Sequence, residues 1–187
     1  PVVPFVGMEP AVKPAAEHTR SGVVGVLATV STVQSAVFAS VVARFAQGVQ
    51  VIQQACPELV RQIEVGAFDT PRTEAMLRGW LEPMLERGID ALVLGCTHYP
   101  IVRPLIERIV GPGVRVIDPA PAIARRVQHI LDERDALAPA GAQGSLTCWT
   151  SGPVHTFRSM LEHLGLPGHD VHAACWPNEA LVTPCTS

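Results

Sequence analysis

The chain has 187 residues, of which 48% are hydrophobic and 17% are charged, and its formal net charge is −3. That is enough apolar sequence for a packed core in one domain or two small ones. The slightly acidic charge and the 5% aromatic content argue against a nucleic-acid surface, and no apolar run is long enough to cross a membrane.

Short apolar runs alternate with helical patterns along the whole chain, which predicts a mainly parallel α/β sheet covered by helices on both faces. The predicted strands are Val2–Val6, Val23–Ala28, Val49–Gln53, Ala91–Leu94, Val114–Ile117 and Ser145–Trp149, with a weaker one at Asp170–Ala174. The predicted helices are Val33–Ala46, Glu58–Val65, Arg72–Arg87, Ile101–Val110, Ala120–Arg134 and Val154–Leu164. Glycines stand where five of these helices should end, at Gly48, Gly66, Gly88, Gly111 and Gly165.

The cysteines give no sign of a metal site. They form no CxxC pair and have no metal-type spacing to the seven histidines, so zinc is a poor candidate. Their odd number and wide scatter instead predict mostly unpaired thiols in a reducing cytoplasm. The five are Cys56, Cys96, Cys148, Cys175 and Cys185.

The most informative segment follows the predicted strand Ala91–Leu94. After Gly95 come a thiol, a hydroxyl and an imidazole in consecutive positions, at Cys96, Thr97 and His98. α/β proteins bind ligands at the carboxyl ends of parallel strands. The start of a helix there favours an anion, so we expect the thiol to ionise more readily than a free one. A cysteine packed as a small hydrophobe would fit the same strand end, but it would not need two polar neighbours.

Two other segments carry candidate polar residues. Thr29 and Thr32 follow the strand predicted at Val23–Ala28, where hydroxyls and amides can hold a carboxylate. The alternative is that Ser31 or Thr32 only caps the next helix. Glu64 lies near the end of a predicted helix, where the helix dipole disfavours an anion. This position suggests another use for its carboxylate, and a solvated surface glutamate is the alternative.

Four segments together resemble glutamate racemases of the aspartate/glutamate racemase superfamily. They are Gly7–Ala16 (GMEPAVKPAA), Gly25–Thr32, Ala55–Gly66 (ACPELVRQIEVG) and, most specifically, Leu94–Pro100 (LGCTHYP). The resemblance implies a cytoplasmic isomerase that needs no cofactor or metal. It would interconvert L- and D-glutamate and supply D-glutamate for peptidoglycan.

The resemblance also implies a fold and a set of partners. Two similar α/β domains would hold the substrate between them. Residues 15–118 would form one complete domain, and residues 1–14 and 119–187 would form part of the other. The expected partners are glutamate and a second copy of the chain in a homodimer, with neither a nucleic acid nor a membrane.

The resemblance assigns roles to six residues. In the family two cysteines face opposite sides of the substrate α-carbon, and Cys96 would be the second of them. His98 would assist its proton transfer, and Glu64 would be a carboxylate near the site. Thr97 would lie beside the substrate, and two hydroxyls would lie near its carboxylate. These are the hydroxyls of Thr29 and Thr32.

The family pattern is incomplete in this chain. Its first third, with the other catalytic cysteine, has no counterpart, and none of the remaining four cysteines has the right context. The sequence also starts at Pro1 in a strand-like run. We therefore expect that sequence is missing upstream and that this chain alone does not racemise glutamate.

Three other functions stay open at this point. An aspartate or hydantoin racemase would use a similar fold, but His98 favours the glutamate enzyme, since aspartate racemases usually carry glutamate there. A non-catalytic remnant could still bind a dicarboxylate. A cysteine hydrolase with Cys96 as nucleophile and His98 as base is disfavoured, because neighbouring side chains at a strand end usually point apart.

Overall fold

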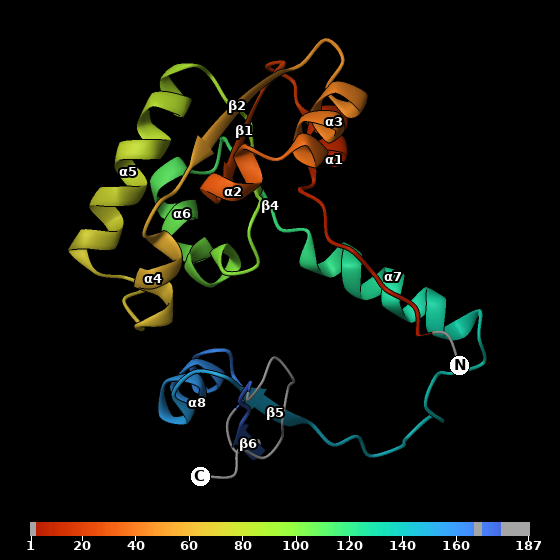
Figure 1. Ribbon diagram of the computed structural model, residues 1–187. Coiled ribbons are helices and arrows are strands. Elements are labelled where there is room, and N and C mark those ends of the chain that lie inside the picture. Colours follow the sequence, from red (N-terminus) through yellow and green to blue (C-terminus); the bar gives the residue numbers. More distant parts are fainter. Residues whose placement is uncertain (1–2, 167–169, 177–187) are drawn as a thin grey trace. The chain divides into compact units, whose positions relative to one another are not determined.

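The computed structural model describes residues 3–166 and 170–176. The chain divides into two compact units (Figure 1). One consists of Pro1–Ile63 with Ala67–Leu137, and the other of Glu64–Gly66 with Ala138–Ser187. The assignment of residues 15–118 to one racemase domain, and of residues 1–14 and 119–187 to another, stays a prediction.

The first unit is built on a four-stranded parallel sheet in the order β2-β1-β3-β4. Helices lie on both faces of the sheet (Figure 1), which confirms the predicted α/β fold. The elements of this unit are α1 (Val12–His18), β1 (Val23–Ala28), α2 (Val30–Val33), α3 (Ala36–Phe45), β2 (Gln50–Ala55), α4 (Leu59–Glu64), α5 (Pro71–Glu86), β3 (Ala91–Leu94), the 3₁₀ helix η1 (Tyr99–Val102), α6 (Arg103–Val110), β4 (Arg115–Ile117) and α7 (Ala120–Asp132).

Burial on both faces explains why the central strands are continuously apolar. In β1, Val24 and Val26 belong to a buried cluster that also contains Val12 of α1 and Phe38 of α3. Gly25 faces the other side, where a Cβ atom would lie 3.2 Å from Met84 Sδ of α5. A strand with helices on both sides has no solvated face, so it lacks the alternation of apolar and polar residues.

Two predicted elements differ in the structure. The helix predicted at Val33–Ala46 is split into α2 and α3, because the Ser35 hydroxyl accepts a hydrogen bond from the Phe38 amide (3.1 Å) and starts a new helix. The strand predicted at Val2–Val6 is wrong for residues 3–6, and Val2 lies outside the described residues. Residues 3–6 pair with no strand among the described residues, and Phe5 is 95% exposed.

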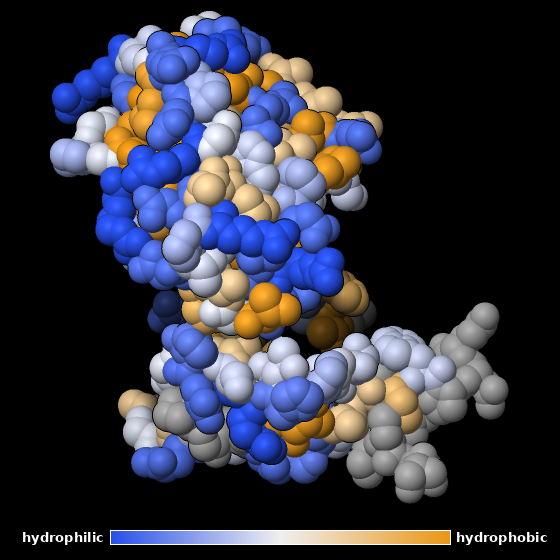
Figure 2. All heavy atoms as spheres, turned by 90° about the vertical axis from the view of Figure 1, so that its left-hand side faces the viewer, coloured by the Kyte–Doolittle hydropathy of each residue, from blue (hydrophilic) through white to orange (hydrophobic). Residues whose placement is uncertain are grey.

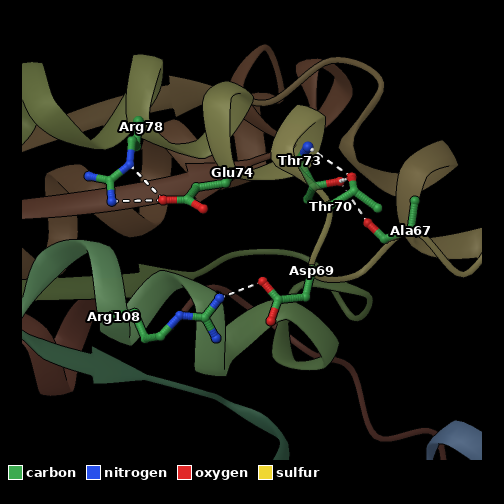
Figure 3. Close-up of polar contacts among 7 residues, drawn as sticks. All are labelled: Ala67, Asp69, Thr70, Thr73, Glu74, Arg78 and Arg108. Carbon is green, nitrogen blue, oxygen red and sulfur yellow. Dashed lines mark hydrogen bonds and ion pairs between the residues drawn. The ribbon is translucent and has the colours of Figure 1, made fainter.

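Hydrogen bonds at the start of α5 fix that helix against the loop before it (Figure 3). The Thr70 hydroxyl caps the helix by accepting from the Thr73 amide (3.2 Å). Thr73 is fully buried, and its hydroxyl donates to the Ala67 carbonyl (2.6 Å). Asp69 in the same loop forms an ion pair with Arg108 of α6. These contacts tie α5 to α6, which cover the same face of the sheet.

The surface over α5 is well solvated. Figure 2 shows this face of the first unit as mostly hydrophilic, with only scattered apolar residues. Arg78 of α5 forms ion pairs with Glu74 (2.7 Å) and Glu82 (3.4 Å), one helical turn to either side. In the part of the chain that is described, no helix is long and apolar enough to cross a membrane.

The second unit contains a small strand–helix–strand motif. Strands β5 (Thr147–Thr150) and β6 (Asp170–Ala173) pair in parallel, and α8 (Val154–His163) connects them. This agrees with the two strands and the helix predicted in this region, with shifts of one or two residues at their ends. The rings of Trp149 and His172 lie opposite each other on the two strands, with their centroids 4.6 Å apart.

Asp90 joins the start of β3 to the loop before β1. Its carboxylate accepts hydrogen bonds from the Thr19 hydroxyl (2.5 Å) and from the amides of Arg20 (2.6 Å) and Ser21 (2.8 Å). Partial burial raises the pKa of Asp90, but these hydrogen bonds outweigh that effect and lower the pKa from 3.8 to about 2. The folded state therefore prefers the ionised form.

We predict that Asp90→Asn lowers the free energy of unfolding by about 1 kcal/mol at pH 7, because the amide oxygen is a weaker acceptor than the carboxylate and the site is only partly buried. Since the pKa of Asp90 is lower in the folded state, its contribution is complete above about pH 4 and is lost as the pH falls towards about 2. Urea unfolding of both proteins across that range is the measurement. An equal difference at pH 6 and pH 2 would contradict the assignment.

Candidate active site

Parallel pairing of two neighbouring strands brings the predicted site residues together. Leu27 of β1 is paired with Leu94 of β3, so both strands end at the same edge of the sheet. Thr29 follows β1, and Cys96 follows β3. This edge is where parallel α/β sheets bind their ligands.

A cavity of about 250 Å³ opens at this edge. Four of the six predicted site residues line it, namely Thr29, Thr32, Cys96 and Thr97. The remaining lining residues are Met8, Glu9, Pro10, Leu94, Gly95 and Pro119. Glu9 is the charged residue among them, so the other polar groups that face this cavity are hydroxyls, a thiol and the backbone. Such neutral groups can bind an anion by hydrogen bonding.

The Cys96 thiol is half-buried and has an imidazole beside it. Cys96 Sγ lies 3.9 Å from His98 Nδ1, near the outer limit for a hydrogen bond that involves sulfur. The Thr97 hydroxyl lies 3.5 Å from the same nitrogen. The side chains at positions 96 and 98 approach each other because the chain turns here, with the Tyr99 amide bonded to the Cys96 carbonyl (3.2 Å). Proton transfer between a thiol and an imidazole needs the two groups to be neighbours, with a shorter contact at the moment of transfer.

Gly95 allows the Cys96 turn to lie close to β1. Its amide donates to the Leu27 carbonyl (2.7 Å). A Cβ atom at this position would come within 2.8 Å of the same carbonyl oxygen and 3.2 Å of Ala28 Cβ. Only glycine fits between these backbones without displacing one of them.

The two threonines on β1's side of the cavity form a local pair. Thr29 is the N-cap of α2, and its hydroxyl accepts from the Thr32 amide (3.2 Å). The hydroxyls of Thr29 and Thr32 are 2.9 Å apart. A hydroxyl therefore does cap this helix, as the alternative interpretation expected. The prediction that Ser31 or Thr32 is the cap is wrong, because both lie inside α2. Thr29 is the cap and also lines the cavity.

Glu64 is placed differently from the other candidates. It is the last residue of α4, it is exposed, and it does not line the cavity at Cys96. Its role near the substrate stays a prediction, as do the roles of His98 and the threonines. Sequence reasoning missed Glu9 and Pro119 as cavity residues. Pro119 could have been found, because it follows β4, the strand next to β3.

The described residues contain no group of three or more side chains suited to hold a metal ion. Three free thiols lie in the described part of the chain, Cys56, Cys96 and Cys148. Cys56 is 3% exposed, so it cannot meet a ligand directly. Among the described residues that line the cavity, Cys96 is the one that carries a thiol.

The family model for Asp/Glu/Hydantoin racemase matches residues 1–127. The chain belongs to this racemase family. The glutamate racemase of Roseiflexus sp. (strain RS-1) is 49% identical over 175 residues, which is 93% of this chain and 64% of the relative. That of Pseudomonas putida KT2440 is 49% identical over 173 residues, or 92% and 65% of the two chains. The chain thus spans less than two thirds of the length of these two relatives.

Solved racemase structures share the fold. Escherichia coli glutamate racemase, in complex with L-glutamate and the activator UDP-MurNAc-ala, has a TM-score of 0.73 at 29% identity, covering 88% of this chain and 62% of its own. Glutamate racemase isoform RacE1 from Bacillus anthracis has a TM-score of 0.74 at 28% identity, with coverages of 90% and 62%. The resemblance found in the sequence is confirmed at the level of the family and the fold.

We predict that Gly95→Ala lowers the free energy of unfolding by about 1–3 kcal/mol, because the added methyl group meets backbone that cannot move away freely. Gly79→Ala is the matched control. Gly79 is an exposed residue of α5 with open space around its Cα, so alanine there should stabilise the helix by up to about 1 kcal/mol. Urea unfolding distinguishes the two, and similar effects of both changes would refute the close-packing argument.

Proposed function

We propose that this chain forms part of a cofactor-independent glutamate racemase in which Cys96 is one of two acid/base thiols. The observation that carries the proposal is the cavity at the carboxyl end of β1 and β3, with the Cys96 thiol on one wall and the hydroxyls of Thr29, Thr32 and Thr97 on the others. The names of the relatives and of the solved structures support glutamate as the substrate. The proposal includes supply of D-glutamate for peptidoglycan, a cytoplasmic location and a homodimer.

The residue types fit the chemistry of racemisation. The Cys96 thiolate would take the α-proton from one face of glutamate, and the electron pair would move into the α-carboxylate. Hydroxyls placed around that carboxylate would stabilise the charge that develops on it. A thiolate is a suitable base, because surroundings in a protein can bring its pKa near neutrality. His98, 3.9 Å from the sulfur, would accept or return the proton as the thiol changes state.

Inversion needs a proton donor on the opposite face of the α-carbon. The cavity walls in the described residues offer Cys96 as their thiol, and the deeply buried Cys56 cannot serve. We therefore propose that the second thiol comes from sequence beyond this chain. This chain alone should bind glutamate weakly at most and should not racemise it.

The test is proton exchange in D₂O. The full-length polypeptide that contains this chain should exchange the α-proton of glutamate and produce the other enantiomer, which NMR and chiral chromatography detect. Cys96→Ala should reduce racemisation by about 10² to 10⁴-fold, the usual effect of losing a general acid or base. Cys148→Ser is the matched control, because Cys148 is a half-buried free thiol in the second unit. This change should leave the racemisation rate unchanged.

Other outcomes would redirect the assignment. Faster turnover of aspartate than of glutamate would place the protein with the aspartate racemases. Glutamate binding by calorimetry without any α-proton exchange in the full-length protein would identify a binding protein. Full activity of Cys96→Ala would refute the proposed role of the thiol.

A further inference from the structure

Helix α7 carries an apolar stripe that is not buried within the described part of the chain. Its larger apolar residues fall on one side of this 13-residue helix, and its charged and amide side chains fall on the other sides. The α7 stripe consists of Ile123, Val127, Ile130 and Leu131, with two alanines between them. None of the residues of α7 is buried, and Val127, in the middle of the stripe, is 39% exposed. A stripe of this width normally faces a protein core.

The helix has little else to stabilise it. No described helix or strand makes an extensive contact with α7, whereas α5 and α6 both bury apolar residues in the first unit. An isolated helix of about 12–15 residues is only marginally stable in water, and most helices in proteins are stabilised by the packing of their apolar side. The α7 stripe therefore needs a partner.

A mostly apolar groove of about 900 Å³ adjoins the start of α7. Its walls come from α3, β4, the first turns of α7 and the segment Gly7–Pro14. Ile123 lines this groove and also belongs to the α7 stripe, so the two surfaces are continuous. Val37 on the α3 wall is 65% exposed. Single exposed apolar residues are common, but a continuous surface of this kind marks an interaction site.

The occupant is indicated by the length of the relatives and by the path of the chain. This chain covers 64% of the Roseiflexus glutamate racemase and 62% of the solved Escherichia coli enzyme, so each has further sequence that could cover such a surface. Sequence upstream of this chain would enter through residues 3–6, which lead directly into the segment that lines the groove. A tethered segment reaches this surface at a far higher effective concentration than a second copy of the chain does.

We propose that the α7 stripe and the adjoining groove form the surface against which the upstream part of the racemase polypeptide packs. The occupant is an apolar part of the same polypeptide, joined to this chain through residues 3–6. The inference rests on the proposed function in one respect, since it takes this chain as part of a longer racemase. It does not depend on the role of Cys96 or on the identity of the substrate.

This surface also lies next to the candidate active site. The groove and the cavity at Cys96 share four lining residues, Met8, Glu9, Pro10 and Pro119. A segment seated in the groove is therefore a neighbour of the cavity. Packing on α7 would thus bring upstream sequence to the place where the proposed reaction needs its second thiol.

The first experiment measures hydrogen–deuterium exchange by mass spectrometry in this chain and in the full-length polypeptide that contains it. The amides of α7 should exchange at least about tenfold more slowly in the full-length polypeptide, because a covered helix opens less often. The amides of α5 are the internal reference, since α5 already buries Leu77, Leu81 and Met84 in this chain. Their exchange should differ by less than about threefold between the two proteins.

The second experiment places a charge in the middle of the α7 stripe. Val127→Lys should lower the melting temperature of the full-length polypeptide by about 5 °C or more, because an unpaired charge is costly to bury. Gln128→Lys is the matched control, since it adds the same charge on the polar side of the same helix, and it should shift the melting temperature by less than about 2 °C. In this chain alone both variants should stay within about 2 °C of the unchanged chain, because Val127 is exposed.

Val127→Thr decides the matter if the lysine prevents the full-length polypeptide from folding. Threonine keeps the shape of valine and buries one hydroxyl, so it should lower the melting temperature of the full-length polypeptide by about 2–5 °C. It should leave that of this chain alone unchanged.

Four results would overturn the inference. Exchange of α7 that is equally fast in both proteins, or equal effects of Val127→Lys and Gln128→Lys in the full-length polypeptide, would show that the stripe stays uncovered. An equal loss of stability from Val127→Lys in this chain alone would show that the chain already covers its own stripe. Protection of α7 that rises with the concentration of this chain, with a dimer in sedimentation, would assign the surface to a second copy.

The proposed function fails separately. None of these measurements uses glutamate or the Cys96 thiol. An absence of racemisation in the full-length polypeptide would therefore refute the proposed function and leave the comparison of α7 between the two proteins intact.

Discussion

The parallel pairing of β1 with β3 is the interaction on which the candidate site depends. It places Leu27 opposite Leu94 and so brings two strand ends, far apart in the sequence, to one edge of the sheet. Gly95 then lets the turn after β3 approach the backbone of β1 to within hydrogen-bonding distance. Without that approach, Cys96 and Thr29 would not share a cavity.

The pairing is stable because both strands are buried on both faces. Alternate residues of β1 pack against α1 and α3 on one side and towards α5 on the other. The carboxyl edge of the sheet is the part that this packing leaves open, so it can carry polar side chains. Because the strands are buried and only this edge is open, the polar residues predicted for the site follow strands and do not lie within them.

The cavity carries a candidate acid/base group and candidate carboxylate ligands. One wall carries a thiol with an imidazole 3.9 Å away, and the others carry hydroxyls that suit a carboxylate. A racemase needs a base on each face of the α-carbon, and the chain spans 61–65% of the length of three glutamate racemases that it matches. In the function that we propose, this arrangement would serve one half-reaction, namely proton transfer on a single face of the α-carbon.

The sequence by itself was enough to predict the class of fold, the central strands and Cys96 as the thiol at the end of a strand. Val23–Ala28 and Ala91–Leu94 were predicted with the observed limits, because strands buried on both faces leave an unmistakable apolar run. The sequence predicted secondary structure less well where a contact or a cap elsewhere decides whether a strand or helix forms. The run at residues 3–6 has strand-forming residues but no strand to pair with among those described, and the helix after Thr29 breaks where Ser35 can cap. Only the tertiary structure decided that Glu9 and Pro119 line the same cavity as Cys96, whereas Glu64 is not among the residues that line it. These are contacts between residues distant in sequence, and no periodicity records them, because they depend on strand order and on how closely two backbones can approach.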